Sequence, residues 1–166
     1  NVSDLVASGS DEILSFTIGL VTPPLTDWYW IEGLYKGMNE ALNFFGGKLI
    51  GGDFSKGQEK VISITAIGAL GPLNLHRGKG KPGDILLTSG SHGLSRLGLA
   101  ILNNETIQDL QKLPKSLKEE AIQVHQRPHP PIEALKSLLK CKPQGIPWRA
   151  AGTDSSDGLL DAVENI

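Results

Sequence analysis

Four aspartates that lie beside small residues are the side chains of this chain best suited to chemistry. They are Asp4, Asp53, Asp154 and Asp157. Small neighbours let backbone and carboxylate oxygens come close to a ligand, and Mg²⁺ prefers such hard oxygens. The pattern therefore predicts a site for Mg²⁺ and for the phosphates that it bridges.

Each aspartate also has a structural explanation. In Asp154-Ser-Ser-Asp-Gly158 the acids and serines are preferred helix N-caps, although carboxylates crowded at one helix start favour a metal or the helix dipole as a neutralising partner. Gly51-Gly52-Asp53 is also typical of a tight turn closed by the aspartate, and Asp4 precedes an expected helix start at residues 5–7. Capping and metal binding both stay open at this point.

Two further groups could meet an anion. Ser89-Gly-Ser-His-Gly93 is a glycine-rich turn, but it lacks the Gly-Lys-Ser/Thr ending of a P-loop and the three-glycine spacing of a dinucleotide fold. Either its backbone amides hold an anion or it packs a helix closely on a strand, with His92 as a turn residue. Arg77 is a planar, permanently charged donor that suits phosphate, with a solvated surface arginine as the alternative.

Composition excludes several classes. The net charge of −2 gives a nucleic-acid partner little support, and no apolar run reaches the roughly 18 residues of a membrane helix. The single cysteine, Cys141, excludes an internal disulfide and suits a reducing cytoplasm. The four histidines lack the helical pairing of a zinc site, and no serine–histidine–acid set stands out.

The first half of the chain predicts a strand, a helix and two more strands. Alternation indicates strands at 12–20 and 61–70, with a short strand at 48–52 that delivers Asp53 into a loop. Helical spacing runs from Asp27, the expected N-cap, to Phe45, with Gly46-Gly47 as its end. Because Gly33 and Gly37 cost helix stability, we expect a neighbouring element to pack closely against them.

The second half predicts helices interleaved with two strands. A glycine- and proline-rich stretch at 71–83 is the expected boundary between two domains. The expected strands are 85–88 and 148–152, and the expected helical segments are 94–102, 105–113, 116–126, 132–139 and one from about residue 157. Since the first residue is Asn1 and the only methionine is Met38, we expect the interior of a longer protein.

Several motifs in order give the chain a resemblance to a known family. The motifs are Asn1-Val-Ser-Asp-Leu-Val-Ala-Ser-Gly9, Leu49-Ile-Gly-Gly-Asp53, Arg77, Lys81-Pro-Gly-Asp84, Thr88-Ser-Gly90, Gly98-Leu-Ala-Ile-Leu102, Arg127-Pro128 and Asp154-Ser-Ser-Asp-Gly-Leu159. Together they resemble the bacterial thiamine-monophosphate kinase family from end to end of the chain. That family belongs to an ATP-binding superfamily with aminoimidazole ribonucleotide synthetase and selenophosphate synthetase.

The resemblance implies an α+β fold in two partial domains of the PurM-like kind. Residues 1–72 would be part of an N-terminal ATP-binding and dimerisation domain, in which a mixed sheet with helices pairs across a homodimer into a barrel. Residues 73–83 would be a linker, and residues 84–166 the first part of a C-terminal α/β domain. A cytoplasmic homodimer without nucleic-acid or membrane partners is the implied assembly.

The resemblance also implies a reaction and a site. The reaction is Mg²⁺-dependent transfer of the γ-phosphoryl group of ATP to thiamine monophosphate, giving thiamine diphosphate, without a covalent enzyme intermediate. The implied Mg²⁺ ligands are Asp4, Asp53, Asp154 and Asp157, and the implied ATP contacts are Gly52, Asp53, Arg77 and Ser156. The alternatives are another ATP-dependent enzyme of the superfamily, or a nucleotide-binding or dimerisation module without catalysis.

Two positions depart from the family pattern. Phe54 stands where the family usually has threonine after Gly-Gly-Asp, and Pro131 stands where it commonly has arginine. The second acid of Asp154-Ser-Ser-Asp157 nevertheless favours the kinase over its relatives, which tend to carry threonine and glycine there.

Overall fold

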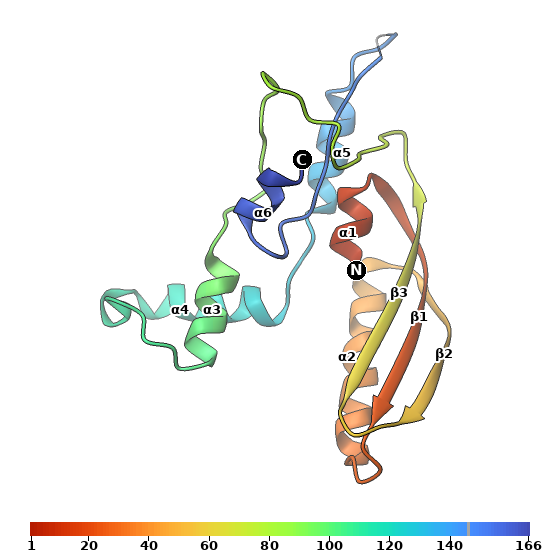
Figure 1. Ribbon diagram of the computed structural model, residues 1–166, viewed down its shortest axis with the longest axis vertical. Helices are drawn as coiled ribbons and strands as arrows, with labels where there is room; N and C mark the ends of the chain where they lie inside the picture. The colour runs from red at the N-terminus through yellow and green to blue at the C-terminus, as the bar shows by residue number, and fades with distance from the viewer. Residues whose placement is uncertain (146) are drawn as a thin grey trace.

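The computed structural model describes residues 1–145 and 147–166, in which the first part holds the strands with two helices and the second part holds helices without strands (Figure 1). The first part consists of α1 (Val2–Ala7), β1 (Ser10–Thr22), α2 (Trp28–Phe45), β2 (Lys48–Lys56) and β3 (Val61–Leu70). The second part consists of α3 (Leu94–Leu102), the short 3₁₀ helix η1 (Leu110–Lys112), α4 (Lys115–Gln126), α5 (Ile132–Lys140) and α6 (Leu159–Glu164).

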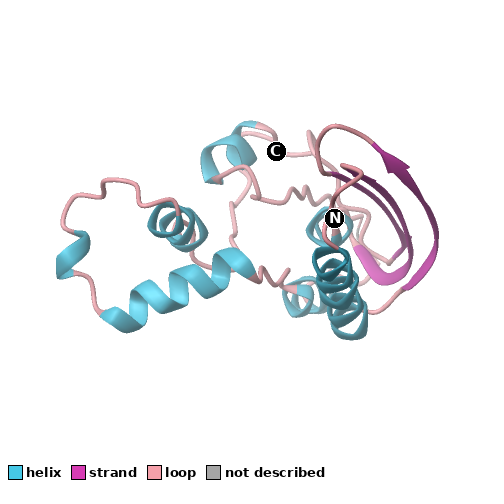
Figure 2. Cartoon of the chain, turned by 90° about the horizontal axis from the view of Figure 1, so that it is seen from below, coloured by secondary structure: helices cyan, strands magenta, loops and turns pink. Residues whose placement is uncertain are grey.

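The three strands form one mixed sheet with β1 in its centre. The strand order is β2-β1-β3, in which β1 pairs parallel with β2 and antiparallel with β3. Alternation along β1 buries Phe16, Ile18 and Leu20 on one face. Figures 1 and 2 show α2 lying along one side of the curved sheet. This confirms the predicted α+β class with a mixed sheet.

A small core joins the two parts of the chain. The core consists of four buried side chains, which are Val6 of α1, Leu73 and Leu75 of the loop after β3, and Leu135 of α5. Trp148 packs against them. Burying such side chains is the main favourable contribution to folding. The segment expected as a linker therefore supplies core residues, while the assigned boundaries at 73–83 stay a prediction.

Helices α3 and α4 pack at very short range. Gly98 of α3 faces the carbonyl oxygen of Ala121, and Ala121 itself is fully buried. Only a residue without a side chain leaves room for this approach.

No helix within the described ranges is both long and apolar enough to cross a membrane.

The structure confirms the helix predicted after Asp27. The Asp27 carboxylate accepts the Tyr29 N–H at 2.9 Å, and the helix ends at Phe45, before Gly46. The expectation that an element packs against Gly33 and Gly37 is wrong for this chain, because a Cβ at either position would meet nothing within 4 Å.

The strands expected at 85–88 and 148–152 do not form. In the described part of the chain all residues of these two segments lie outside helices and strands, and Ile85 and Leu87 are 86% and 75% exposed. A strand needs a neighbour for its backbone hydrogen bonds, and residues 1–145 and 147–166 provide none at either place. Of the helix expected at 105–113 only η1 forms, and α6 begins at Leu159, after the Asp154–Gly158 loop.

Candidate functional site

The loop 154–158 is the place where polar contacts from three other segments meet. The firmest contact is an ion pair, in which Arg77 Nη2 donates to Asp154 Oδ1 at 2.8 Å. The Asp154 side chain is only 11% exposed, whereas that of Arg77 is 55% exposed. Arg77 can therefore still reach a ligand with its other nitrogens while it holds the aspartate.

The surroundings of Asp154 keep it ionised. Partial burial raises the pKa of its carboxyl, but hydrogen bonds from the Ser156 hydroxyl, Arg77 and the Ser156 N–H outweigh the burial, so that the pKa lies below the ordinary value of 3.8. Arg77 bonds to Oδ1 of this ionised carboxylate, which leaves the other oxygen as a hard donor of the kind that Mg²⁺ prefers.

Two weaker contacts bring further segments to the loop. Ser3 of α1 and Ser156 share a hydrogen bond at 3.5 Å between their hydroxyl oxygens. His92 Nε2 lies 3.1 Å from the Ser155 hydroxyl oxygen. The contact of His92 adds a residue to the site that sequence reasoning treated as a turn residue, and the glycine-rich turn at 89–93 was the signal for it.

Asp4 follows Ser3 in the sequence and lies inside the helix α1. It was expected in a loop before a helix at 5–7, whereas α1 begins at Val2, so that Asp4 lies in the first turn. Its carboxylate is 63% exposed, and its carbonyl oxygen accepts the Ser8 hydroxyl at 2.8 Å. The Ser3 contact therefore brings the helix that carries Asp4 to the loop, without a direct contact of Asp4 itself.

Asp53 lies within β2 rather than in a loop after it, and Gly52 lies within the strand as expected. The parallel ladder with β1 continues to Lys56 and pairs Asp53 with Gly19, which is why the strand does not end at residue 52 as expected. A Cβ on Gly52 would lie 2.1 Å from the carbonyl oxygen of Ile18, so this glycine serves the close approach of two strands. The exposed Asp53 accepts the Ser55 hydroxyl at 2.7 Å.

Asp157 is exposed and does not cap α6. The helix N-cap is Gly158, and no side chain there bonds to a free backbone N–H. Capping of α6, one explanation of the Asp154–Gly158 motif, is therefore not what these side chains do.

The structure thus gathers some of the predicted site residues and leaves others apart. Asp154 contacts both Arg77 and Ser156, and Asp157 lies in the same loop as Asp154. Across residues 1–145 and 147–166, no three His, Cys, Asp or Glu side chains come together closely enough to hold a metal. Asp4 and Asp53 in particular lie on other elements, α1 and β2.

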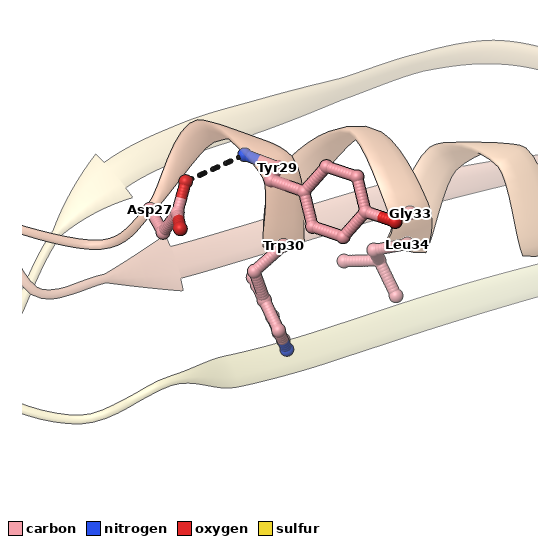
Figure 3. A pocket seen from close by; sticks show the side chains of 5 residues that line it. All are labelled: Asp27, Tyr29, Trp30, Gly33 and Leu34. Atoms are coloured by element: carbon pink, nitrogen blue, oxygen red, sulfur yellow. Dashed lines mark hydrogen bonds between the residues drawn. The ribbon is translucent and has the colours of Figure 1, made fainter.

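A hollow near the start of α2 is unrelated to these residues. It is lined by Asp27, Tyr29, Trp30, Gly33 and Leu34, as Figure 3 shows. The Asp27 carboxylate in it is occupied by the Tyr29 N–H. None of the predicted metal or ATP residues lines this hollow, so it is not a candidate for the same chemistry.

Comparison with known proteins shows which proteins this chain is similar to. Residues 1–70, which end with β3, match the family described as AIR synthase related protein, N-terminal domain. The thiamine-monophosphate kinase of Prochlorococcus marinus is 56% identical over 166 residues, covering 100% of this chain and 50% of the relative. The enzyme of the same name from Escherichia coli K12 is 33% identical over 172 residues, covering 100% of this chain and 47% of the relative.

Solved structures agree with the sequence relatives. Thiamine monophosphate kinase from Aquifex aeolicus superposes with a TM-score of 0.72 at 29% identity, covering 84% of this chain and 45% of that chain. A structure described as AaThiL complexed with AMPPCP and TMP gives a TM-score of 0.60 at 26% identity, covering 84% and 43%. The chain is similar along its whole length to thiamine-monophosphate kinases, and it spans about half the length of the relatives it matches.

Proposed function

We propose that the protein containing this chain is a thiamine-monophosphate kinase, which transfers the γ-phosphoryl group of ATP to thiamine monophosphate and forms thiamine diphosphate. The observation that carries the proposal is the Arg77–Asp154 pair beside Ser156, in a chain that is similar along its whole length to kinases of that name. The similarity to AaThiL, a structure described as complexed with AMPPCP and TMP, supports the same reaction.

The residues present fit Mg²⁺ in their chemistry. Asp154 is ionised, and Asp53 and Asp157 are exposed carboxylates, so that hard oxygens are available without a competing soft ligand. We propose Asp4, Asp53, Asp154 and Asp157 as the residues that would hold the metal. Bound Mg²⁺ would neutralise charge on the phosphates during transfer.

The proposed contacts with ATP come from the loop 154–158, from Arg77 and from β2. We propose that Arg77 binds a phosphate with the part of its guanidinium that Asp154 leaves free, and that the Ser156 hydroxyl turns to a phosphate oxygen. The backbone of Gly52 and the carboxylate of Asp53 would approach ATP from β2. These residues position two anions for in-line transfer, which is the main task of a protein in phosphoryl transfer.

Release of ADP by the full-length protein tests the reaction. With Mg²⁺ and ATP, the rate should rise when thiamine monophosphate is added, and thiamine diphosphate should accumulate in equal amount. ADP release that ignores thiamine monophosphate would point to another member of the superfamily. Nucleotide binding without any turnover would point to a non-catalytic module.

We also propose a homodimer in the cytoplasm, without nucleic-acid or membrane partners. The outer strands support the dimer, because β2 is exposed along its whole length and carries Ile50 and Phe54 at 61% and 56% exposure. Large apolar side chains on an edge strand are typical of a surface that another chain covers. Light scattering on the full-length protein should give twice the mass of one chain, and a monomer would contradict the proposal.

A further inference from the structure

A second arginine–aspartate pair lies next to the candidate site. Arg149 donates to Asp84 with both of its terminal nitrogens, each at 2.5 Å from a carboxylate oxygen. It also donates to the carbonyl oxygen of Lys79. This two-pronged arrangement is geometrically more specific than an ordinary surface ion pair. Neither residue was predicted as part of the site.

The partner of Arg149 is itself held in a closed turn. Asp84 accepts the N–H of Lys81 at 2.8 Å, and the N–H of Asp84 donates to the carbonyl oxygen of Lys81 at 3.0 Å. The hydrogen bonds from Arg149 and from the Lys81 N–H lower the pKa of the Asp84 carboxyl below its ordinary value of 3.8. The turn 81–84 therefore presents a fixed, ionised carboxylate to Arg149.

This pair and the Arg77–Asp154 pair connect the same two segments of the chain. Residues 77 and 84 lie on one segment, and residues 149 and 154 lie on the other. In the first pair the arginine belongs to the earlier segment, and in the second pair it belongs to the later one. The backbone adds a link nearby, because the Gly80 N–H donates to the Ile166 carbonyl oxygen at 3.0 Å.

The segment between Arg149 and Asp154 has little room to move. A Cβ on Gly152 would lie 2.5 Å from the carbonyl oxygen of Ala7 and 2.8 Å from Cβ of Leu75. The backbone at Gly152 thus passes directly against the end of α1 and the core. Since Asp154 follows two residues later, the segment is held at Arg149 by Asp84, at Gly152 by packing and at Asp154 by Arg77.

We propose that Asp84 and Arg149 are positioning residues for the nucleotide site, which fix the relative place of Arg77 and Asp154 without touching the nucleotide. The inference rests on the proposed function for its activity readout. The two side chains are 43% and 37% exposed, and an exposed pair contributes little to the free energy of unfolding. Its effect should therefore appear in the geometry of the site.

Four variants of the full-length protein test the pair. They are Asp84→Asn, Arg149→Gln, the double variant, and Arg149→Lys, which keeps the charge but not the fork. For Asp84→Asn and Arg149→Gln we expect the KM for ATP to rise and kcat/KM to fall about tenfold or more, because a small misplacement of positioned groups is costly. The melting temperature should change by only about 4 °C or less.

The pattern across the variants distinguishes positioning from simple stability. The double variant should lose no more than either single one, because both remove the same interaction, and Arg149→Lys should fall between wild type and Arg149→Gln. Arg96→Gln is the matched control, since Arg96 of α3 makes an exposed ion pair at 2.7 Å with Glu105, which follows the helix. Wild-type kinetics in the pair variants, or losses that merely follow a fall in melting temperature, would overturn the proposal.

A second readout separates this inference from the proposed function. Binding of AMPPCP with Mg²⁺, measured by calorimetry, should weaken about tenfold in Arg149→Gln and stay unchanged in Arg96→Gln. If the wild-type protein releases no ADP in response to thiamine monophosphate, the kinase assignment fails and this titration alone decides. Unchanged binding would then refute the positioning role.

Discussion

Arg77 and Asp154 meet at 2.8 Å although they lie on segments that are far apart in the sequence. The arginine comes from the loop after β3 and the aspartate from the loop before α6. Because the aspartate is 11% exposed and the arginine is 55% exposed, the pair has an inner carboxylate and an outer cation. An arriving phosphate would meet the cation first.

Arg77→Gln in the full-length protein should therefore reduce kcat/KM for ATP by about a hundredfold, the usual cost of removing one donor to a transferring group. The fold should persist, because the arginine is exposed. Steady-state kinetics with a circular dichroism melt checks both. Arg96→Gln removes the arginine of the exposed Arg96–Glu105 pair and should behave as wild type. Equal kinetics for both variants would show that Arg77 is an ordinary solvated arginine without a role in binding ATP.

Asp157→Asn should reduce turnover by about a hundredfold or more while the melting temperature stays constant. The substitution removes charge without changing volume, and Asp157 makes no capping bond to α6, whose N-cap is Gly158. Asp161→Asn is the matched control, since it makes the same change of charge within α6. A similar small effect of both would show that Asp157 has no special role in the site.

The parts of the fold with local causes could be predicted from the sequence. The helix α2 follows from its Asp27 cap and its apolar spacing, and β3 forms at the predicted residues 61–70. The segment 85–88 has the same apolar character as a strand, but a strand also depends on a pairing partner, which the described part of the chain does not supply. The exposed Ile85 shows the result.

The candidate site could be predicted only in its residue types. The spacing in Asp154-Ser-Ser-Asp157 identified the loop, yet its contacts with Ser3, Arg77 and His92 depend on how distant segments pack. The pairing of Arg149 with Asp84 could not be predicted, because nothing in either local sequence indicates the other residue. Asp53 was placed after a strand, since a local pattern does not show how far a ladder continues.

The pH dependence of stability should reveal the lowered pKa of Asp154. The pKa of its carboxyl in the folded protein lies below 3.8. The ion pair therefore stabilises the folded state fully above the pKa of the unfolded chain, and this stabilisation is lost as the pH falls through the pKa of the folded state. The difference in unfolding free energy between wild type and Asp154→Asn should stay constant from about pH 7 to about pH 5 and shrink below about pH 4. Urea unfolding at a series of pH values measures this difference. A change between about pH 5 and 8 would mean that the folded state raises the pKa.

The packing of α3 on α4 gives the strongest expected effect on stability. A Cβ on Gly98 would lie 2.1 Å from the carbonyl oxygen of Ala121 and 2.6 Å from its carbonyl carbon, both of which belong to the backbone. The helices must therefore separate in Gly98→Ala, which we expect to cost about 1–3 kcal/mol of unfolding free energy. Gly33→Ala is the opposite control, because a Cβ there meets nothing within 4 Å and alanine favours the helix by about 0.5–1 kcal/mol. Chemical denaturation of the two variants should move the midpoint in opposite directions, and a stable Gly98→Ala protein would contradict the close contact of α3 with α4.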